Sequence, residues 1–226
     1  MKTGTLAALT ILAMASASSA FAEQMTKPAS GVTRVVFDTP GELVIRAGSD
    51  EKVIVEAEPK VLAQLEISTK GETLTLSSKG RFSTDKGIKY SVTIKGFRGL
   101  KTMASGNSTV EGFSGNDVDV ELGGSGDISL KNIKAGRLAI TLKNSGSVDA
   151  SGGGKAVVAK IDGSGNIDTT NYSAQTVDAR IDGAGSIRVH ADESLTATIS
   201  GAGNIEYKGK AKVTQSITGA GTVGRI

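Results

Sequence analysis

The sequence predicts an all-β fold: a right-handed parallel β-helix (β-solenoid) with about 18–20 residues per coil and an irregular β-rich N-terminal cap. The main observation is a repeated phrase, Gly-(Ser/Ala)-Gly-x-(Ile/Val). With two looser copies included, its second glycines fall at positions 106, 126, 146, 165, 185, 203 and 221. The composition agrees, because thirty glycines and only 4% aromatic residues suit thin, turn-rich β-structure.

A second observation is the alternation of apolar and polar residues that precedes each phrase and continues through it. Because side chains of a strand alternate between its two faces, one set must point inward in the C-terminal coils. We expect this inward set to be Leu195, Ala197, Ile199, Gly201, Gly203, Ile205 and Tyr207. The inward glycines predict a tight corner without room for a side chain. The right-handed sense follows from the usual preference of parallel β crossovers.

The N-terminus has the pattern of a cleaved signal peptide, assigned to residues 1–22. Lys2 supplies the positive charge, Leu6 to Met14 the apolar core, and Ala20-Phe21-Ala22 the cleavage site. Residues 23–31 are expected to be a flexible leader, and 32–226 a single domain with a cap region at 32–103 and regular coils at 104–226. Within the cap region, short β-rich runs alternate with turns, and Pro59 to Leu65 favour one or two helical turns.

Composition limits the compartment and the chemistry. The chain has no cysteine, so neither a disulfide nor a lipidated cysteine is expected. No second apolar run is long enough for a transmembrane segment. We therefore expect an exported protein, periplasmic or extracellular. Without Lys2, the 26 basic residues become 25 against 23 acidic ones, a net charge of +2.

Several segments in order resemble the GIN-domain family of auto-transporter adhesin head domains. The similar segments are Arg34-Val35-Val36-Phe37, Leu43-Val44-Ile45, Val53-Ile54-Val55-Glu56-Ala57, Leu65-Glu66-Ile67-Ser68, Gly71-Glu72-Thr73-Leu74-Thr75-Leu76, Ser105-Gly106 and Gly201-Ala202-Gly203-Asn204-Ile205. The resemblance implies a right-handed β-helix on an exported bacterial protein. We expect no translocator barrel after the head in this chain, so the auto-transporter part of the description would have no counterpart here.

No catalytic, cofactor-binding or metal-binding residue is predicted. His190 is the single histidine and is expected to be an exposed turn residue, which leaves Ser-His-Asp chemistry without support. Stacking places Asp162 above Asp182, where Ca²⁺ is one way to relieve repulsion, but Lys143 in the same column favours a solvated, charge-balanced surface. Asp127 lies one position too early for a calcium-binding nonapeptide repeat.

Two surface features offer binding hypotheses beside an ordinary solvated surface. A column of short polar residues follows the second glycines, which suits either a hydrogen-bonded corner or a strip for glycans: Asn107, Asp127, Ser147, Asn166, Ser186, Asn204 and Thr222. The segment from Lys70 to Lys101 has eight basic and two acidic residues, a net +6 that favours anionic lipid, lipopolysaccharide or acidic glycan. Nucleic acid is not expected as a partner.

We therefore expect an exported, non-enzymatic β-solenoid that acts as a binding or structural module of the bacterial cell envelope, adhesin-like in character. Its partner would be an envelope glycan, an anionic lipid or a protein. The alternative is a polysaccharide-active enzyme, a lyase or hydrolase, on the same scaffold. Self-association is a further hypothesis, because the terminal coil ends at Ile226 with Val213, Ile217 and Val223 uncovered.

Overall fold

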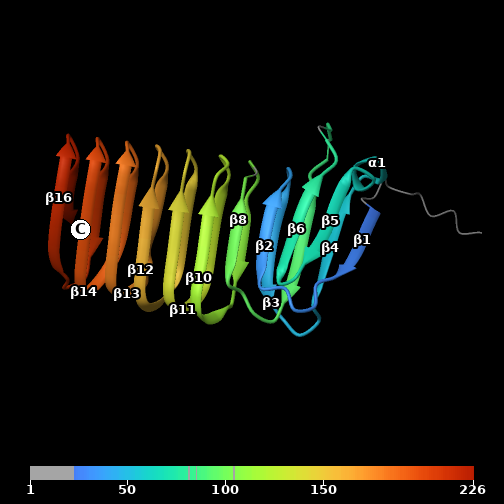
Figure 1. The fold of residues 1–226 in the computed structure, drawn as a ribbon, viewed down its shortest axis with the longest axis horizontal. Helices are drawn as coiled ribbons and strands as arrows, with labels where there is room; N and C mark the ends of the chain where they lie inside the picture. Colours follow the sequence, from blue (N-terminus) through green and yellow to red (C-terminus); the bar gives the residue numbers. More distant parts are fainter. Residues whose placement is uncertain (1–22, 81, 85, 104) are drawn as a thin grey trace, which may run out of the picture.

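A computed structural model describes residues 23–80, 82–84, 86–103 and 105–226. The predicted signal peptide, residues 1–22, lies outside the described residues. The described chain forms one 17-stranded sheet that winds into about six stacked coils, and the parallel β-solenoid predicted from the repeat is confirmed (Figure 1).

The strands fall into an N-terminal and a regular group. The N-terminal group consists of β1 (Glu23–Pro28), β2 (Arg34–Asp38), β3 (Glu42–Ala47), β4 (Lys52–Ala57), α1 (Pro59–Leu62), β5 (Leu65–Lys70), β6 (Thr73–Ser78), β7 (Lys89–Ile94), β8 (Gly99–Thr102) and β9 (Ser108–Glu111). The regular group consists of β10 (Ser114–Leu122), β11 (Asp127–Leu142), β12 (Ser147–Ile161), β13 (Asn166–Gly183), β14 (Ser186–Gly201), β15 (Asn204–Lys208), β16 (Lys212–Gly219) and β17 (Thr222–Arg225).

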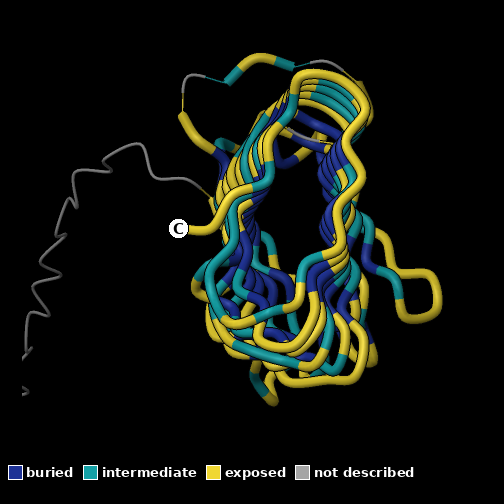
Figure 2. The backbone as a smooth tube through the Cα atoms, turned by 90° about the vertical axis from the view of Figure 1, so that its left-hand side faces the viewer, coloured by how far each residue is buried: buried dark blue, intermediate teal, exposed yellow. Residues whose placement is uncertain are grey.

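The coil has two long faces joined at the glycine corner. We call them the pre-glycine face, which includes β6, β2, β8, β10 and β16, and the post-glycine face, which includes β7, β3, β9, β15 and β17. Strands β11 to β14 bend, so each contributes to both faces. Viewed end-on, the coils superimpose and the buried positions line the interior (Figure 2).

The interior consists of ladders of like residues one coil apart. On the pre-glycine face, Leu142 pairs with Ile161, Ile161 with Ile181, and Ile181 with Ile199, all essentially inaccessible. On the post-glycine face, Ile167, Ile187 and Ile205 form the equivalent ladder. Each such side chain contributes roughly 1.5–3 kcal/mol by leaving water, so the stacking of neighbouring coils stabilises the fold.

The glycine corner is as tight as the sequence predicts. A Cβ placed on Gly203 would lie 2.7 Å from the carbonyl oxygen of Gly185 and 2.7 Å from Cγ2 of Ile181. The corner of one coil thus packs directly on the backbone of the previous coil. The phrase recurs because each corner meets the same constraint.

The first coils do not follow chain order. Strand β2 lies between β6 and β8, and β3 lies between β7 and β9, so the coil of residues 34–47 is inserted between later segments. Phe37 and Tyr90 meet edge-to-face across this junction, with ring centroids 5.2 Å apart. The parallel stack therefore includes residues 34–47 and β6 to β8, which belong to the region expected to form the N-terminal cap, 32–103.

Antiparallel strands close the N-terminal end. Strand β4 pairs with β7, β1 pairs with β4, and β5 pairs with β6. The predicted helical turn is present as α1, which buries Val61 and Leu62 against this end. The expectation of a flexible leader at 23–31 is wrong, because residues 23–28 form β1. Its antiparallel pairing with β4, from Glu23 opposite Ala57 to Pro28 opposite Lys52, covers an edge of β4 that would otherwise be exposed.

Candidate binding surface

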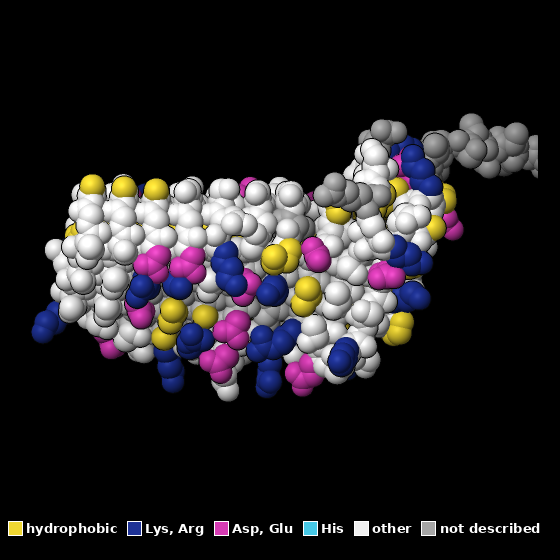
Figure 3. All heavy atoms as spheres, turned by 45° about the horizontal axis from the view of Figure 1, so that its top comes forward, with side chains coloured by type: hydrophobic (Ala, Val, Ile, Leu, Met, Phe, Trp, Pro, Cys, Tyr) yellow, Lys and Arg dark blue, Asp and Glu magenta, His cyan; other side chains and the backbone are white. Residues whose placement is uncertain are grey.

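The pre-glycine face is charged but locally neutral. Its acidic and basic side chains alternate along the stack, and they gather in a band over the middle of the molecule (Figure 3). Asp119 pairs with Arg34 at 3.4 Å and with Arg137 at 3.3 Å. Glu121 pairs with Lys101 at 3.1 Å and with Lys143 at 2.9 Å, and the hydrogen bond from Lys143 lowers the pKa of this carboxyl. Such exposed pairs are individually weak. The two acids named here face four cations, and the exposed acids Asp117 of β10 and Asp178 of β13 bring this face close to neutrality.

Asp162 and Asp182 belong to this neutral band. Lys160 pairs with Asp162 at 2.8 Å, and Arg180 pairs with Asp182 at 2.8 Å. The Arg180 hydrogen bond lowers the pKa of Asp182. The column is balanced by these neighbours, and not by Lys143 as expected, because Lys143 reaches Glu121. Among the described residues, no group of three or more His, Cys, Asp or Glu side chains is placed to hold a metal ion.

A shallow groove crosses the same face, and Gly99 is among the residues that line it. Val36 and Ala139 contribute to its apolar lining, and Arg34 and Lys101 flank it. Both flanking cations are paired with acids of β10. The groove therefore has an apolar lining with paired charges beside it, and Thr73 and Thr141 add uncharged hydroxyl groups.

The column of short polar residues on the post-glycine face bonds mainly to itself. The Asn107 Oδ1 atom accepts the Asp127 N–H at 3.4 Å, and the Asp127 Oδ1 atom accepts the Ser147 N–H at 2.9 Å. Further along, the Thr222 hydroxyl donates to Asn204 Oδ1 at 2.8 Å. These bonds between coils support the hydrogen-bonded corner over the glycan strip.

Next to this column lies Asp149, whose pKa is raised by partial burial and by the charges of Asp168 and Asp127. Asp168 has compensating partners, since Thr170 donates its N–H and its hydroxyl to Asp168 Oδ1. Arg188 also lies 3.5 Å from Asp168 Oδ2. The uncompensated charge of Asp149 was missed in the sequence, because the like-charge contact depends on the register between coils.

His190 differs from its predicted place. It lies within β14, not in an exposed turn, and its side chain is 27% exposed. The Nε2 atom is 3.2 Å from Asp192 Oδ1. His190 therefore makes a surface contact with a single carboxylate.

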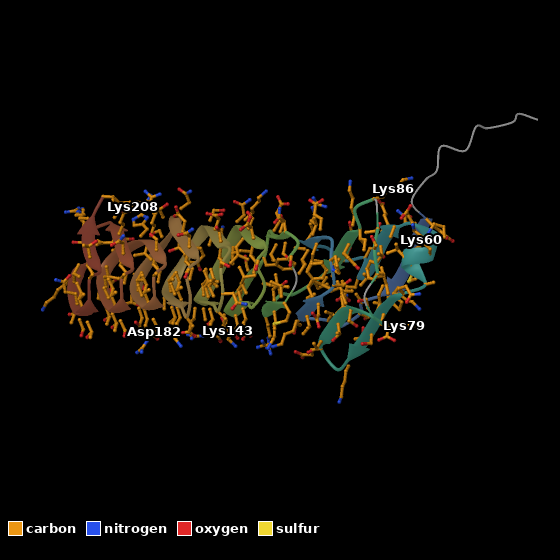
Figure 4. All side chains as sticks on the ribbon, turned by 90° about the horizontal axis from the view of Figure 1, so that it is seen from above. Lys60, Lys79, Lys86, Lys143, Asp182 and Lys208 are labelled. Atoms are coloured by element: carbon orange, nitrogen blue, oxygen red, sulfur yellow. The ribbon has the colours of Figure 1, made fainter. Side chains whose placement is uncertain are left out.

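The fold disperses the basic segment from Lys70 to Lys101. Lys95 pairs with Glu51 at 3.1 Å, Arg98 lies 3.9 Å from Glu72, and Lys101 belongs to the neutral band. Lys79 and Lys86 lie towards opposite edges of the cap when the molecule is viewed from above (Figure 4). Arg81 and Asp85 lie outside the described residues. The described members of the +6 segment do not form one basic patch.

The far end of the solenoid, residues 208–226, is different, and we call it the C-terminal rung. Strand β16 pairs only with β14, and β17 only with β15, so within the described structure their outer edges have no neighbouring strand. Ile217 is 39% exposed and Ile226 is 53% exposed, whereas the equivalent interior residue Ile199 is 1% exposed. Gln215 occupies the inward column of Ala197 and is exposed. This end combines open backbone edges with uncovered apolar side chains.

Basic residues gather at one corner of the C-terminal rung. We call Lys208, Lys210, Lys212 and Arg225 the basic corner. The first three surround the turn from β15 to β16, and Arg225 Nη2 donates to the Gly209 carbonyl oxygen at 2.8 Å. The rung contains neither Asp nor Glu, and no ion pair of these cations occurs among the described residues. The opposite corner, Gly219-Ala220-Gly221, carries no charge.

These features define a class: a β-solenoid with one closed end and one open, basic end. A family whose description reads "Putative auto-transporter adhesin, head GIN domain" matches residues 32–211. The chain belongs to this GIN-domain family.

Solved structures share the fold. A putative adhesin from Bacteroides fragilis is 23% identical, with a TM-score of 0.86, over 90% of this chain and 96% of that chain. A putative lipid binding protein from Parabacteroides distasonis is 22% identical, with a TM-score of 0.68, over 90% and 96% of the two chains. A putative adhesin from Parabacteroides merdae is 21% identical, with a TM-score of 0.68, over 90% and 95%. At these identities the likeness supports the fold alone.

No curated protein matches the chain. Of the helices in the described residues, none has the length and apolar character needed to span a membrane.

Proposed function

We propose that the protein is an exported, non-enzymatic binding module of the bacterial cell envelope, adhesin-like in character, which engages its partner through the C-terminal rung. The observation that carries the proposal is the contrast between this rung and the rest of the surface. Elsewhere, most charges are paired, and antiparallel strands cover the outermost parallel strands β6 and β7 at the N-terminal end. The rung, in contrast, leaves its parallel edges, its apolar side chains and its four cations uncovered.

Export is supported by the pattern of residues 1–22 and by the family's description as an adhesin head. The full chain expressed in a bacterium should be found in the periplasmic or extracellular fraction with Glu23 as its first residue. Recovery of an uncleaved, cytoplasmic protein would contradict the export part of the proposal.

Binding is tested with residues 23–226 and isolated bacterial envelopes in a co-sedimentation assay. We expect binding that decreases in the double variant Lys210→Glu/Lys212→Glu, because the reversal removes the positive charge of the rung. The matched control is Lys70→Glu/Lys89→Glu, which changes charge equally at the closed end and should bind like the unchanged protein. Equal binding by all three proteins would exclude the C-terminal rung as the binding surface.

A further inference from the structure

The open edge of the C-terminal rung indicates the kind of partner that it can bind, which deepens the proposed function and rests on it. An edge strand offers a row of unpaired N–H and C=O groups, and these are best satisfied by another strand. The inward positions of β16 are Val213, Gln215 and Ile217, which continue the columns of Leu195, Ala197 and Ile199. A covering strand with apolar residues at alternate positions would bury Val213 and Ile217 as the inner coils bury their equivalents.

The charges of the C-terminal rung favour some partners of its open edge over others. A second copy of this rung brings four further cations and no acid, so it leaves the basic corner unmatched in either orientation of the strands. Like charges brought together at an interface oppose association. Self-association, one of the hypotheses from the sequence, is therefore disfavoured by the composition of the rung itself.

The inner side of the rung shows which charges the preceding coil places near the basic corner. Strand β14 lies against β16 in parallel register, from Ser194 opposite Lys212 to Gly201 opposite Gly219. The residues just before Ser194 are Asp192 and Glu193, so the preceding coil places two acids at the same corner. Asp192 accepts from the Ser173 hydroxyl and pairs with His190, so the two acids add negative charge near the basic corner without forming an ion pair with it. The outer side has the same backbone edge and the same cations, but no acidic coil.

We propose that the outer edge of β16 binds an extended acidic segment of a partner protein, which adds as one more strand and places its carboxylates beside Lys210 and Lys212. Backbone hydrogen bonds supply the pairing, alternate apolar side chains cover Val213 and Ile217, and the acids fix the end at which the segment starts. Arg225 is held against the turn by its bond to Gly209, so it adds a fixed positive charge to the same corner.

The chain provides its own probe. A dye-labelled peptide with the sequence of residues 192–201, Asp-Glu-Ser-Leu-Thr-Ala-Thr-Ile-Ser-Gly, carries the acids and the alternation that β16 already accepts from its inner side. The control peptide replaces both acids by lysine and keeps the other eight residues. Binding of each to residues 23–226 is measured by fluorescence anisotropy at low and at physiological salt.

We expect the acidic peptide to bind about tenfold more tightly than the lysine peptide at low salt, because several exposed charge pairs change sign together. The difference should shrink with added salt. In Lys210→Glu/Lys212→Glu the preference should disappear, because two cations and two acids leave the basic corner without net charge. In the control Lys70→Glu/Lys89→Glu the preference should persist. Circular dichroism melts verify that the variants stay folded, which is expected since all four lysine side chains lie at the surface.

Three results would overturn the inference. The first is equal or absent binding of the two peptides. The second is a dimer in sedimentation that Lys210→Glu/Lys212→Glu abolishes while no peptide binds, which would assign the edge to a second copy. The third is binding to phosphatidylglycerol vesicles, sensitive to the same substitutions, while no peptide binds, which would assign the rung to a lipid surface. Envelope binding that depends on the rung without peptide binding would retain the proposed function and reject this inference alone.

Discussion

The two ends of this solenoid differ in whether their outermost parallel strands are covered. At the N-terminal end, β1, β4 and β5 turn antiparallel and α1 adds Val61 and Leu62, so the first parallel strands have a cover. At the C-terminal end, β16 and β17 continue the parallel ladder and stop with Ile217 exposed. A repeat therefore builds the middle of a solenoid, whereas its ends depend on residues that break the repeat.

The largest expected effect tests whether an isoleucine in the buried middle contributes more to stability than an isoleucine in the exposed C-terminal rung. Ile187→Asp places a charge in a fully buried ladder and should cost roughly 3–5 kcal/mol of unfolding free energy. Ile217→Asp at the exposed end should cost less than about 1 kcal/mol. Urea titrations followed by circular dichroism compare the two. Equal losses would show that the C-terminal rung is as tightly packed as the middle.

The next effect concerns the glycine corner. Gly203→Ala would force a methyl group against the carbonyl oxygen of Gly185 and the Ile181 side chain, at a cost of about 1–3 kcal/mol. Gly224 in β17 has nothing within 4 Å of an added Cβ, so Gly224→Ala should be neutral or slightly stabilising. Thermal melts of both variants give the measurement. A similar melting temperature for both would indicate that the corner relaxes and that the glycines are not required there.

Acid should affect the two ends differently, since the closed end depends on carboxylates and the C-terminal rung has no acidic side chain. The Lys95 hydrogen bond lowers the pKa of Glu51, which also accepts the Gly31 N–H at 3.3 Å. A carboxyl whose pKa is lower in the folded state stabilises the protein at pH values above its unfolded-state pKa, near 4.5. This contribution is lost as the pH falls through the folded-state pKa.

The melting temperature should therefore be flat from pH 7 to about pH 5 and should fall below about pH 4.5. Glu51→Gln should lower the melting temperature at pH 7 and reduce its dependence on pH. Hydrogen exchange should locate the acid-induced opening at β1 and β4, near Glu51. Opening of β16 first, at the same pH, would contradict this account of the closed end.

The smallest effect is expected in the stacked middle, where coils bring like charges together. Burial and the charges of Asp168 and Asp127 raise the pKa of Asp149, so its ionised form destabilises the fold at neutral pH. Asp149→Asn should raise the melting temperature by a few degrees at pH 7, and the gain should vanish at pH 3, where the carboxyl is protonated. Asp168→Asn is the matched control and should give no such gain, because the amide removes the carboxylate oxygen Oδ2 that lies 3.5 Å from Arg188, while its Oδ1 still accepts from Thr170.

Much of the middle was determined by the sequence alone. The period near twenty residues, the alternation and the recurrent glycines are local signals, and each specifies which side of a strand must be buried. Leu195, Ala197 and Ile199 were assigned to the interior from alternation, and all three are buried. The corner at Gly203 was likewise predicted from the absence of a side chain in an inward position.

The charged and terminal features were not accessible in the same way. The partner of Lys143 is Glu121, 22 positions earlier, and Asp149 meets Asp168 only because their coils stack in register. The sum of +6 from Lys70 to Lys101 left open a surface for anionic ligands beside an ordinary solvated surface, but the chain path sends those residues to different sides. A net charge counted along a segment says little when consecutive strands belong to different faces.

The sequence by itself determined that the chain is a stack of coils, which coil positions face inward, and that the terminal coil is basic and without acids. Only the tertiary structure decided that residues 34–47 lie between β6–β7 and β8–β9, that residues 23–28 cover β4, and that the outer edge of β16 is open. The physical reason is that the alternation of apolar and polar residues specifies which face of a strand is buried, but not which strand lies beside it. Any strand with the same inward pattern satisfies the same ladder, so strand order is set by turns, chain length and the side chains that meet once the coils are stacked.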